Sequence, residues 1–178
     1  MKRALIYLGI LGLLGSATAA EQPFQASLTP DVALYPKTEP IAGLTLSLWG
    51  ENPQNSLAIG IVNGTSGRSG GASLGAMNYG DGYIGAQFSL VNYDKGDFLG
   101  WQAGAVNLAG GRCTGWQVGV VNYAGNLSGL QLGLVNIAAR ADGGVQLGAV
   151  NIIRDNNAWF QECPKALAPA MIVANWRF

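Results

Sequence analysis

The side chains of this chain that could do chemistry are scattered carboxylates, two thiols and rows of amides. Its 178 residues include no histidine, which removes the commonest general base and the commonest neutral metal ligand. Asp94 and Asp97 share one turn, and Asp142 and Asp155 flank a later segment, so we interpret these acids as solvated turn residues rather than a catalytic pair. No calcium-loop or phosphate-loop motif occurs. We therefore predict no catalytic residue, no metal site, no cofactor and no enzymatic activity.

The two thiols belong to Cys113 and Cys163. In an exported chain such a pair suggests a disulfide. A disulfide requires Cα atoms within about 7 Å of one another. In the ten-strand barrel considered below the two cysteines would lie on opposite rims, so the bridge and that barrel exclude each other. A solenoid, or a barrel with a different strand count, would permit the bridge.

The amides recur at a regular spacing inside an eight-residue word, Gly-hydrophobic-Gln-hydrophobic-Gly-hydrophobic-Val-Asn, which is clearest at residues 115–122, 129–136 and 144–151. An asparagine closes each word every 14 or 15 residues, at Asn63, Asn78, Asn92, Asn107, Asn122, Asn136 and Asn151. The glutamines are Gln87, Gln102, Gln117, Gln131 and Gln146. We predict that the glutamines face a lumen, which they either line as a narrow passage or fill by bonding to one another. The asparagines are interpreted as strand-ending turn residues in preference to ligands.

The words that carry these amides alternate with period two, which predicts strands with two different faces. One face of the clearest word carries Trp116 and Val118, and the other carries Gly115 and Gln117. Charged residues fall only in the gaps between words, where Gly, Asn, Ser and Asp are typical of turns. We expect about ten strands, at 25–35, 43–50, 56–63, 70–78, 83–92, 98–107, 114–122, 128–136, 143–152 and 169–178.

Two all-β architectures fit this pattern. The first is an antiparallel transmembrane β-barrel of about ten strands, with eight as the lower count, built from the 14–15-residue repeats with the apolar face toward lipid. The second is a β-solenoid with the apolar face inside, in which each asparagine stacks on the next. The barrel explains the uncharged strands and is the leading prediction. The stacked asparagines and the short strands favour the solenoid.

The first residues have the pattern of an export signal. Lys2 and Arg3 precede an apolar stretch at residues 4–14 and small residues at 17–20, so we predict a cleaved signal peptide at 1–20 and a single domain at 21–178. Removing the signal leaves eight basic residues against ten acidic ones, a net charge of about −2. This charge disfavours nucleic acid as a partner. The predicted location is the bacterial outer membrane, with the periplasm or the medium as the alternative.

The repeat words, the segment 49–52 (Trp-Gly-Glu-Asn) and the ending 175–178 (Asn-Trp-Arg-Phe) resemble a family of uncharacterised exported surface-repeat proteins of Gram-negative-type bacteria. The resemblance covers residues 25–178. The alternating end of the chain, with Trp176 and Phe178, is similar to the C-terminal strand by which outer-membrane barrels are recognised for assembly. The resemblance implies membrane lipid and the outer-membrane assembly machinery as partners. It implies no established activity, and it leaves any small-molecule ligand unknown.

Three functions follow as hypotheses. The leading one is a non-enzymatic outer-membrane surface or structural protein. The second is a narrow pore for small neutral solutes, lined by the glutamines. The third is a secreted β-solenoid that acts as a binding module. The long gap at 153–167, which contains Trp159 and Phe160, would serve either as a surface contact or as a loop packed on the rim.

Overall fold

The computed structural model describes residues 21–178, so the predicted signal peptide lies outside the described residues. The described chain is all-β. Its eleven strands are β1 (Gln22–Thr29), β2 (Val32–Ala33), β3 (Ile41–Asn52), β4 (Asn55–Leu74), β5 (Met77–Phe88), β6 (Val91–Asp94), β7 (Phe98–Ala103), β8 (Val106–Val118), β9 (Val121–Leu132), β10 (Val135–Ile153) and β11 (Ala170–Arg177). Within residues 21–178 there is no helix of a length and hydropathy that would cross a membrane.

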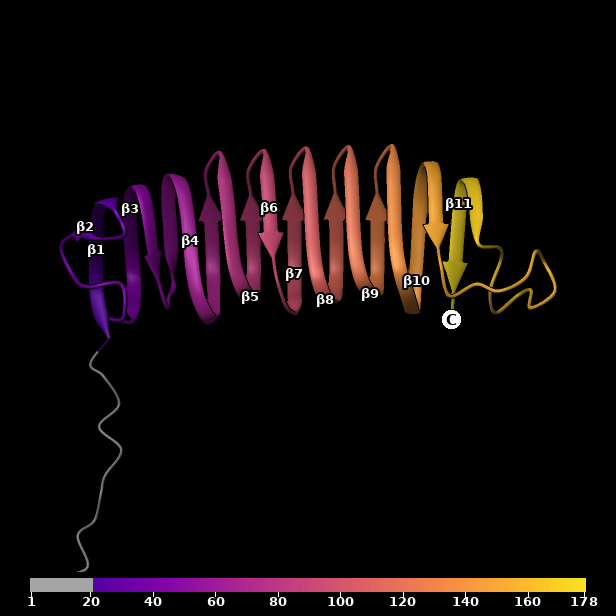
Figure 1. The fold of residues 1–178 in the computed structure, drawn as a ribbon, viewed down its shortest axis with the longest axis horizontal. Helices are drawn as coiled ribbons and strands as arrows, with labels where there is room; N and C mark the ends of the chain where they lie inside the picture. Colours follow the sequence, from indigo (N-terminus) through magenta and orange to yellow (C-terminus); the bar gives the residue numbers. More distant parts are fainter. Residues whose placement is uncertain (1–20) are drawn as a thin grey trace, which may run out of the picture.

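Successive strands pair in parallel with a register equal to the repeat. Asn107 of β8 lies beside Asn122 of β9, which lies beside Asn136 of β10, and every strand from β3 to β10 pairs with its neighbours in this parallel sense. The chain therefore winds as a β-solenoid of about eight turns (Figure 1). The predicted antiparallel barrel is wrong. One repeat is one full turn, so each word returns to its own register instead of reversing through a hairpin.

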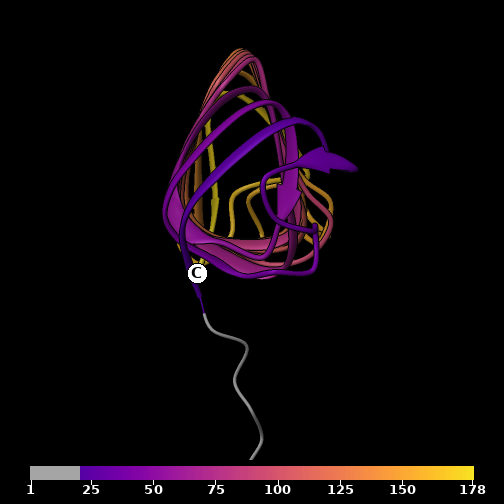
Figure 2. The ribbon, with the colours of Figure 1, turned by 90° about the vertical axis from the view of Figure 1, so that its left-hand side faces the viewer.

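The two glycines of each word allow the chain to bend and stack this closely. Gly115 has φ of 125°, and a Cβ there would overlap the carbonyl oxygen of Gly100 in the turn before. A Cβ on Gly119 would lie 2.7 Å from the Nδ2 atom of Asn107. Only glycine combines the positive φ with this close approach. The cross-section narrows to a pointed corner at the upper edge of the solenoid, which we call the apex (Figure 2).

The solenoid is inverted relative to the one expected from the sequence, because the amides of its repeat words lie inside and the apolar side chains that alternate with them lie outside. Gln117 and Asn122 are fully buried, whereas Trp101 and Trp116 are 55% and 47% exposed. The narrow interior accepts amides because a parallel stack spaced by ~4.8 Å places each amide in reach of the next. Beside the amides the interior holds an apolar cluster and, in the first turns, buried hydroxyl side chains such as Ser69 and Ser73. The apolar cluster consists of Tyr83, Phe98, Ala109, Cys113, Ala124, Leu127, Ala138, Ala141 and Ile153.

The two ends of the solenoid are closed by strands that leave the repeat. At the first end β1 pairs in parallel with β3, and the short β2 folds back on β1. At the last end β11 pairs antiparallel with β10, and its only sheet partner among the described strands is β10. Trp176 and Phe178 therefore do not close a barrel. The Trp176 indole donates to the carbonyl of Pro164 at 2.9 Å, and Phe178 is 69% exposed.

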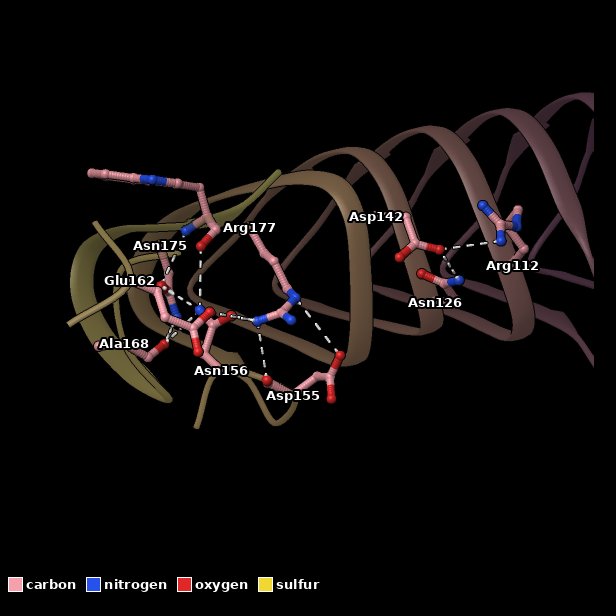
Figure 3. A network of polar contacts seen from close by, with 10 residues as sticks. Arg112, Asn126, Asp142, Asp155, Asn156, Glu162, Ala168, Asn175 and Arg177 are labelled. Carbon is pink, nitrogen blue, oxygen red and sulfur yellow. Dashed lines mark hydrogen bonds and ion pairs between the residues drawn. The ribbon is translucent and has the colours of Figure 1, made fainter. Parts of the chain in front are cut away.

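A polar network fastens this last turn. Asn175 donates to the carbonyl of Ala168 at 2.8 Å, and Asn156 donates to the same carbonyl at 2.9 Å (Figure 3). Arg177 forms ion pairs with Asp155 and Glu162 at 3.7 and 3.5 Å. The final strand therefore covers an edge that would otherwise offer unpaired backbone groups.

Candidate binding surface

The repeat asparagines form a continuous buried ladder. From Asn63 to Asn151 each Nδ2 donates to the Oδ1 of the next asparagine at 2.8 to 3.0 Å. The second Nδ2 hydrogen is directed at the turn at the apex: Asn107 donates to the Val118 carbonyl and Asn122 to the Leu132 carbonyl, both at 2.9 Å. The ladder thus bonds backbone carbonyls of the apex from inside the molecule.

The glutamines form a second ladder that runs in the opposite direction. Each Nε2 from Gln102 to Gln146 donates to the Oε1 of the preceding glutamine at 2.7 to 3.0 Å. Gln117 also donates to the carbonyl of Tyr123 at 3.0 Å. These side chains are fully buried, and they occupy the interior by bonding to one another. They line no barrel lumen, and this packing gives no support to a passage for solutes.

Asp94 is buried at one end of the glutamine ladder, which differs from its interpretation as a solvated turn residue. It accepts hydrogen bonds from Gln102 at 2.8 Å and Gln87 at 3.4 Å. The position stacked on it in the next turn is Ala109. Burial raises the pKa of Asp94 to about 7, although the two amides act in the opposite direction. Asp94 is therefore poised to change charge near neutral pH.

The other candidate reactive groups are not brought together. Cys113 is buried and Cys163 is exposed, and both are free thiols. Burial raises the pKa of Cys113 to about 12, which suppresses its thiolate. Asp142 is exposed, whereas Asp155 belongs to the network of the last turn. Residues 21–178 contain no cluster of three or more potential metal ligands.

Charged side chains gather on the side opposite the apex, which we call the base. Lys95 pairs with Asp81 at 3.1 Å. Arg112 pairs with Asp142 at 3.2 Å, and Asn126 donates to the same carboxylate at 2.7 Å (Figure 3). In Figure 1 strand β6 runs from the apex to the lower edge of the solenoid, and Lys95 directly follows its last residue, Asp94. The base is a solvated, mixed-charge surface.

The apex and its two adjoining faces carry rows of outward apolar side chains, which we call the apolar wedge. The row at the apex comprises Leu48, Ile61, Leu90, Val120 and Leu134, each about half exposed or more. The face before the apex carries Leu74, Phe88, Trp101, Trp116, Val118, Leu130, Leu132 and Leu147. The face after it carries Met77, Val91, Val106, Val121, Val135 and Val150. Trp101 and Trp116 stack with centroids 5.2 Å apart and planes within 4°.

The wedge is hollowed near the first end of the solenoid. A groove of about 640 Å³ lies between the fold-back of β2 and the outer surface of β3 and β4. Its apolar lining includes Leu28, Val32, Leu46, Leu48, Ile59 and Ile61. The groove contains no charged side chain, so it extends the apolar character of the wedge to that end.

These apolar rows were predicted from the alternation in the sequence, on the lipid side of a barrel or on the inside of a solenoid, whereas they lie on the outside of a solenoid. The period-two alternation separates the two faces of a strand without showing which one is enclosed. The sequence predicted the charged residues of the base only as turn residues between the repeat words. Comparison of the chain with protein-family models, with curated proteins and with solved structures finds no match.

Proposed function

We propose that this chain is an exported β-solenoid binding module that holds its partner on the apolar wedge. The observation that carries the proposal is the continuity of the apex row, which runs from Leu48 to Leu134 with every large member exposed. Eight turns at ~4.8 Å give a length of ~38 Å, and the five residue steps from position 116 to position 121 of a turn span ~17 Å, so the wedge covers roughly 600 Å². Monomeric proteins rarely expose contiguous apolar patches beyond a few hundred Å².

The interior supports the same proposal. Its amides are committed to the two ladders, and its thiol, Cys113, is buried with a raised pKa. Two ion pairs on the base, Lys95–Asp81 and Arg112–Asp142, join residues one and two turns apart. The outer apolar rows are thus the feature that the fold itself does not use, and a partner would remove them from water.

The proposal is tested with an apolar fluorescent probe, anilinonaphthalene sulfonate, added to the folded chain. We expect saturable binding that falls at least threefold in the double variant Val118→Ser/Leu132→Ser, which replaces two apolar side chains at the middle of the face before the apex by hydroxyls. The control is Ala139→Ser on the base, where binding should not change. A wild-type chain that unfolds cooperatively and binds no probe, or binds it equally in the double variant, would contradict the proposal.

A further inference from the structure

We infer that the partner of the apolar wedge is a lipid bilayer surface, into which the apex inserts with the solenoid axis parallel to the membrane. This inference rests on the proposed function and names the class of partner. It is a peripheral arrangement in which the wedge enters one leaflet and the base stays in water. Three features of the wedge, namely its shape, its backbone hydrogen bonds and its charge distribution, point to lipid.

The shape of the wedge favours a partner that can cover both of its faces at once. The apolar rows lie on both faces that diverge from the apex, and Figure 2 shows the two faces meeting at a point. A second copy in a two-fold dimer would cover one face, at most ~13 Å by ~38 Å or roughly 500 Å² per partner, which is less than the ~800 Å² per partner of a standard stable interface. The other face would remain in water. Lipid chains surround the apex and cover both faces together.

The depth of the wedge matches one leaflet. From Trp116 to Val120 the chain advances four residues, or ~13 Å at ~3.3 Å per residue. The hydrocarbon of one leaflet is about 15 Å thick, half of the ~30 Å core. The apolar rows therefore reach the depth of a single leaflet and not of a full bilayer.

The backbone at the apex is suited to an environment without water. A polar backbone group in lipid needs a partner within the protein. At the Val118–Val121 turn, Gly119 N–H donates to Leu132 at 2.9 Å, Val120 N–H donates to Ala105 at 2.9 Å, and Val121 N–H donates to Ala105 at 3.0 Å. The carbonyl of Leu132 also accepts from the asparagine ladder. These backbone N–H groups of the corner, and the Leu132 carbonyl, therefore have hydrogen-bond partners within the protein.

The charge distribution gives the wedge one orientation. The outward rows that form the wedge contain no charged side chain, whereas Lys95, Arg112, Arg140 and Asp142 all lie on the base. On the face after the apex, a row that includes Tyr79, Tyr93 and Tyr123 lies between the valines and the base. Tyrosine is enriched where a protein crosses from hydrocarbon to headgroups. The tyrosines therefore mark the level at which the membrane surface would meet the solenoid.

The test is flotation of the chain with neutral phosphatidylcholine vesicles. We expect wild type and Ala139→Asp, which adds one charge on the base, to float with the vesicles. Val120→Asp/Leu134→Asp, which adds two charges at the apex, should lower the vesicle partition coefficient by ~30-fold or more, since a carboxylate in hydrocarbon is strongly disfavoured. Absence of wild type from the vesicles would overturn the inference.

Failure of the inference is distinguishable from failure of the proposed function. A wild type that ignores vesicles but forms a dimer, dissociated by the apex substitutions, would replace lipid with a second copy and leave the binding module standing. A chain that ignores both vesicles and the apolar probe would end both proposals.

A second measurement keeps the inference testable if the apex variant does not fold. A solvent-sensitive fluorophore is placed on Leu134→Cys or on Ala139→Cys, each in a Cys163→Ser background with Cys113 left buried. Vesicles should shift the emission of the label at 134 to the blue and leave the label at 139 unchanged. Equal shifts at both positions, or none at 134, would overturn the inference.

Discussion

Replacing Asp94 by asparagine should remove a pH-dependent loss in the free energy of unfolding. The carboxyl is fully buried beside Gln87 and Gln102, and burial raises its pKa to about 7 from the ordinary value of 3.8. In the unfolded chain the carboxyl ionises near its ordinary pKa of 3.8. Between pH ~4 and pH ~7 the folded chain therefore binds one more proton than the unfolded chain. The contribution of Asp94 to the free energy of unfolding is therefore fully present below pH ~4 and is lost as pH rises toward 7. The shift corresponds to about 4 kcal/mol at ~1.36 kcal/mol per pKa unit.

The asparagine side chain resembles the neutral acid in shape and cannot ionise, so Asp94→Asn should escape this loss. We expect the variant to exceed wild type in free energy of unfolding by about 4 kcal/mol at pH 8, with the difference falling by about 3 kcal/mol at pH 5. Urea unfolding followed by circular dichroism at pH 5, 6, 7 and 8 measures both proteins. A difference that stays constant across this range would refute the argument that Asp94 is buried without a compensating charge.

The control is Asp142→Asn, which removes an exposed carboxyl on the base. The hydrogen bond from Asn126, followed by the charge of Arg112, lowers the pKa of Asp142. Its stabilisation is therefore present above the ordinary pKa and is lost as pH falls through the lowered one, the opposite sign to Asp94. Between pH 5 and 8 the control should show no pH-dependent difference from wild type.

Two further substitution experiments and one labelling experiment test the interior. Asn107→Ala should destabilise the chain by ~2–4 kcal/mol in urea unfolding, because it interrupts the ladder and leaves buried polar groups without partners; a loss below ~1 kcal/mol would contradict the ladder. Gly115→Ala should cost clearly more than Gly67→Ala, since both have positive φ but only the Cβ at 115 meets backbone atoms; equal losses would contradict the close stacking. A thiol reagent should modify Cys163 alone in the native chain and Cys113 only in urea, and rapid native labelling of both would contradict the burial of Cys113.

The spacing of the asparagines predicted the period of the fold, and the alternation in 115–122 separated the amide face from the apolar face. Neither could decide between parallel and antiparallel pairing, because period two is common to both. The end of the chain at Phe178 favoured the barrel, yet β11 is an end strand of the solenoid. The positive φ of Gly115, which bends the chain within a repeat, leaves no mark beyond the glycine itself.

The candidate binding surface, like the fold, could be predicted from the sequence only in part. The apolar rows were visible as alternating residues, but their exposure depends on which face the solenoid encloses, and that is decided by the hydrogen bonds between stacked amides. Asp94 could have been found by aligning the repeats, because Ala109 and Ala124 occupy its place in the next two turns. A carboxyl in a position otherwise held by alanine is a sequence signal of a buried charge.

The most direct test of the account is the distance between nitroxide labels on equivalent residues, measured by pulsed electron resonance. Labels at Leu74→Cys/Leu132→Cys are four turns apart and those at Leu74→Cys/Leu147→Cys are five turns apart, both in a Cys163→Ser background. At ~4.8 Å per turn the stacked solenoid predicts distances of about 19 and 24 Å, so the second exceeds the first by one turn. A second distance equal to or shorter than the first would contradict the parallel stacking of the repeats and, with it, the outward apolar wedge.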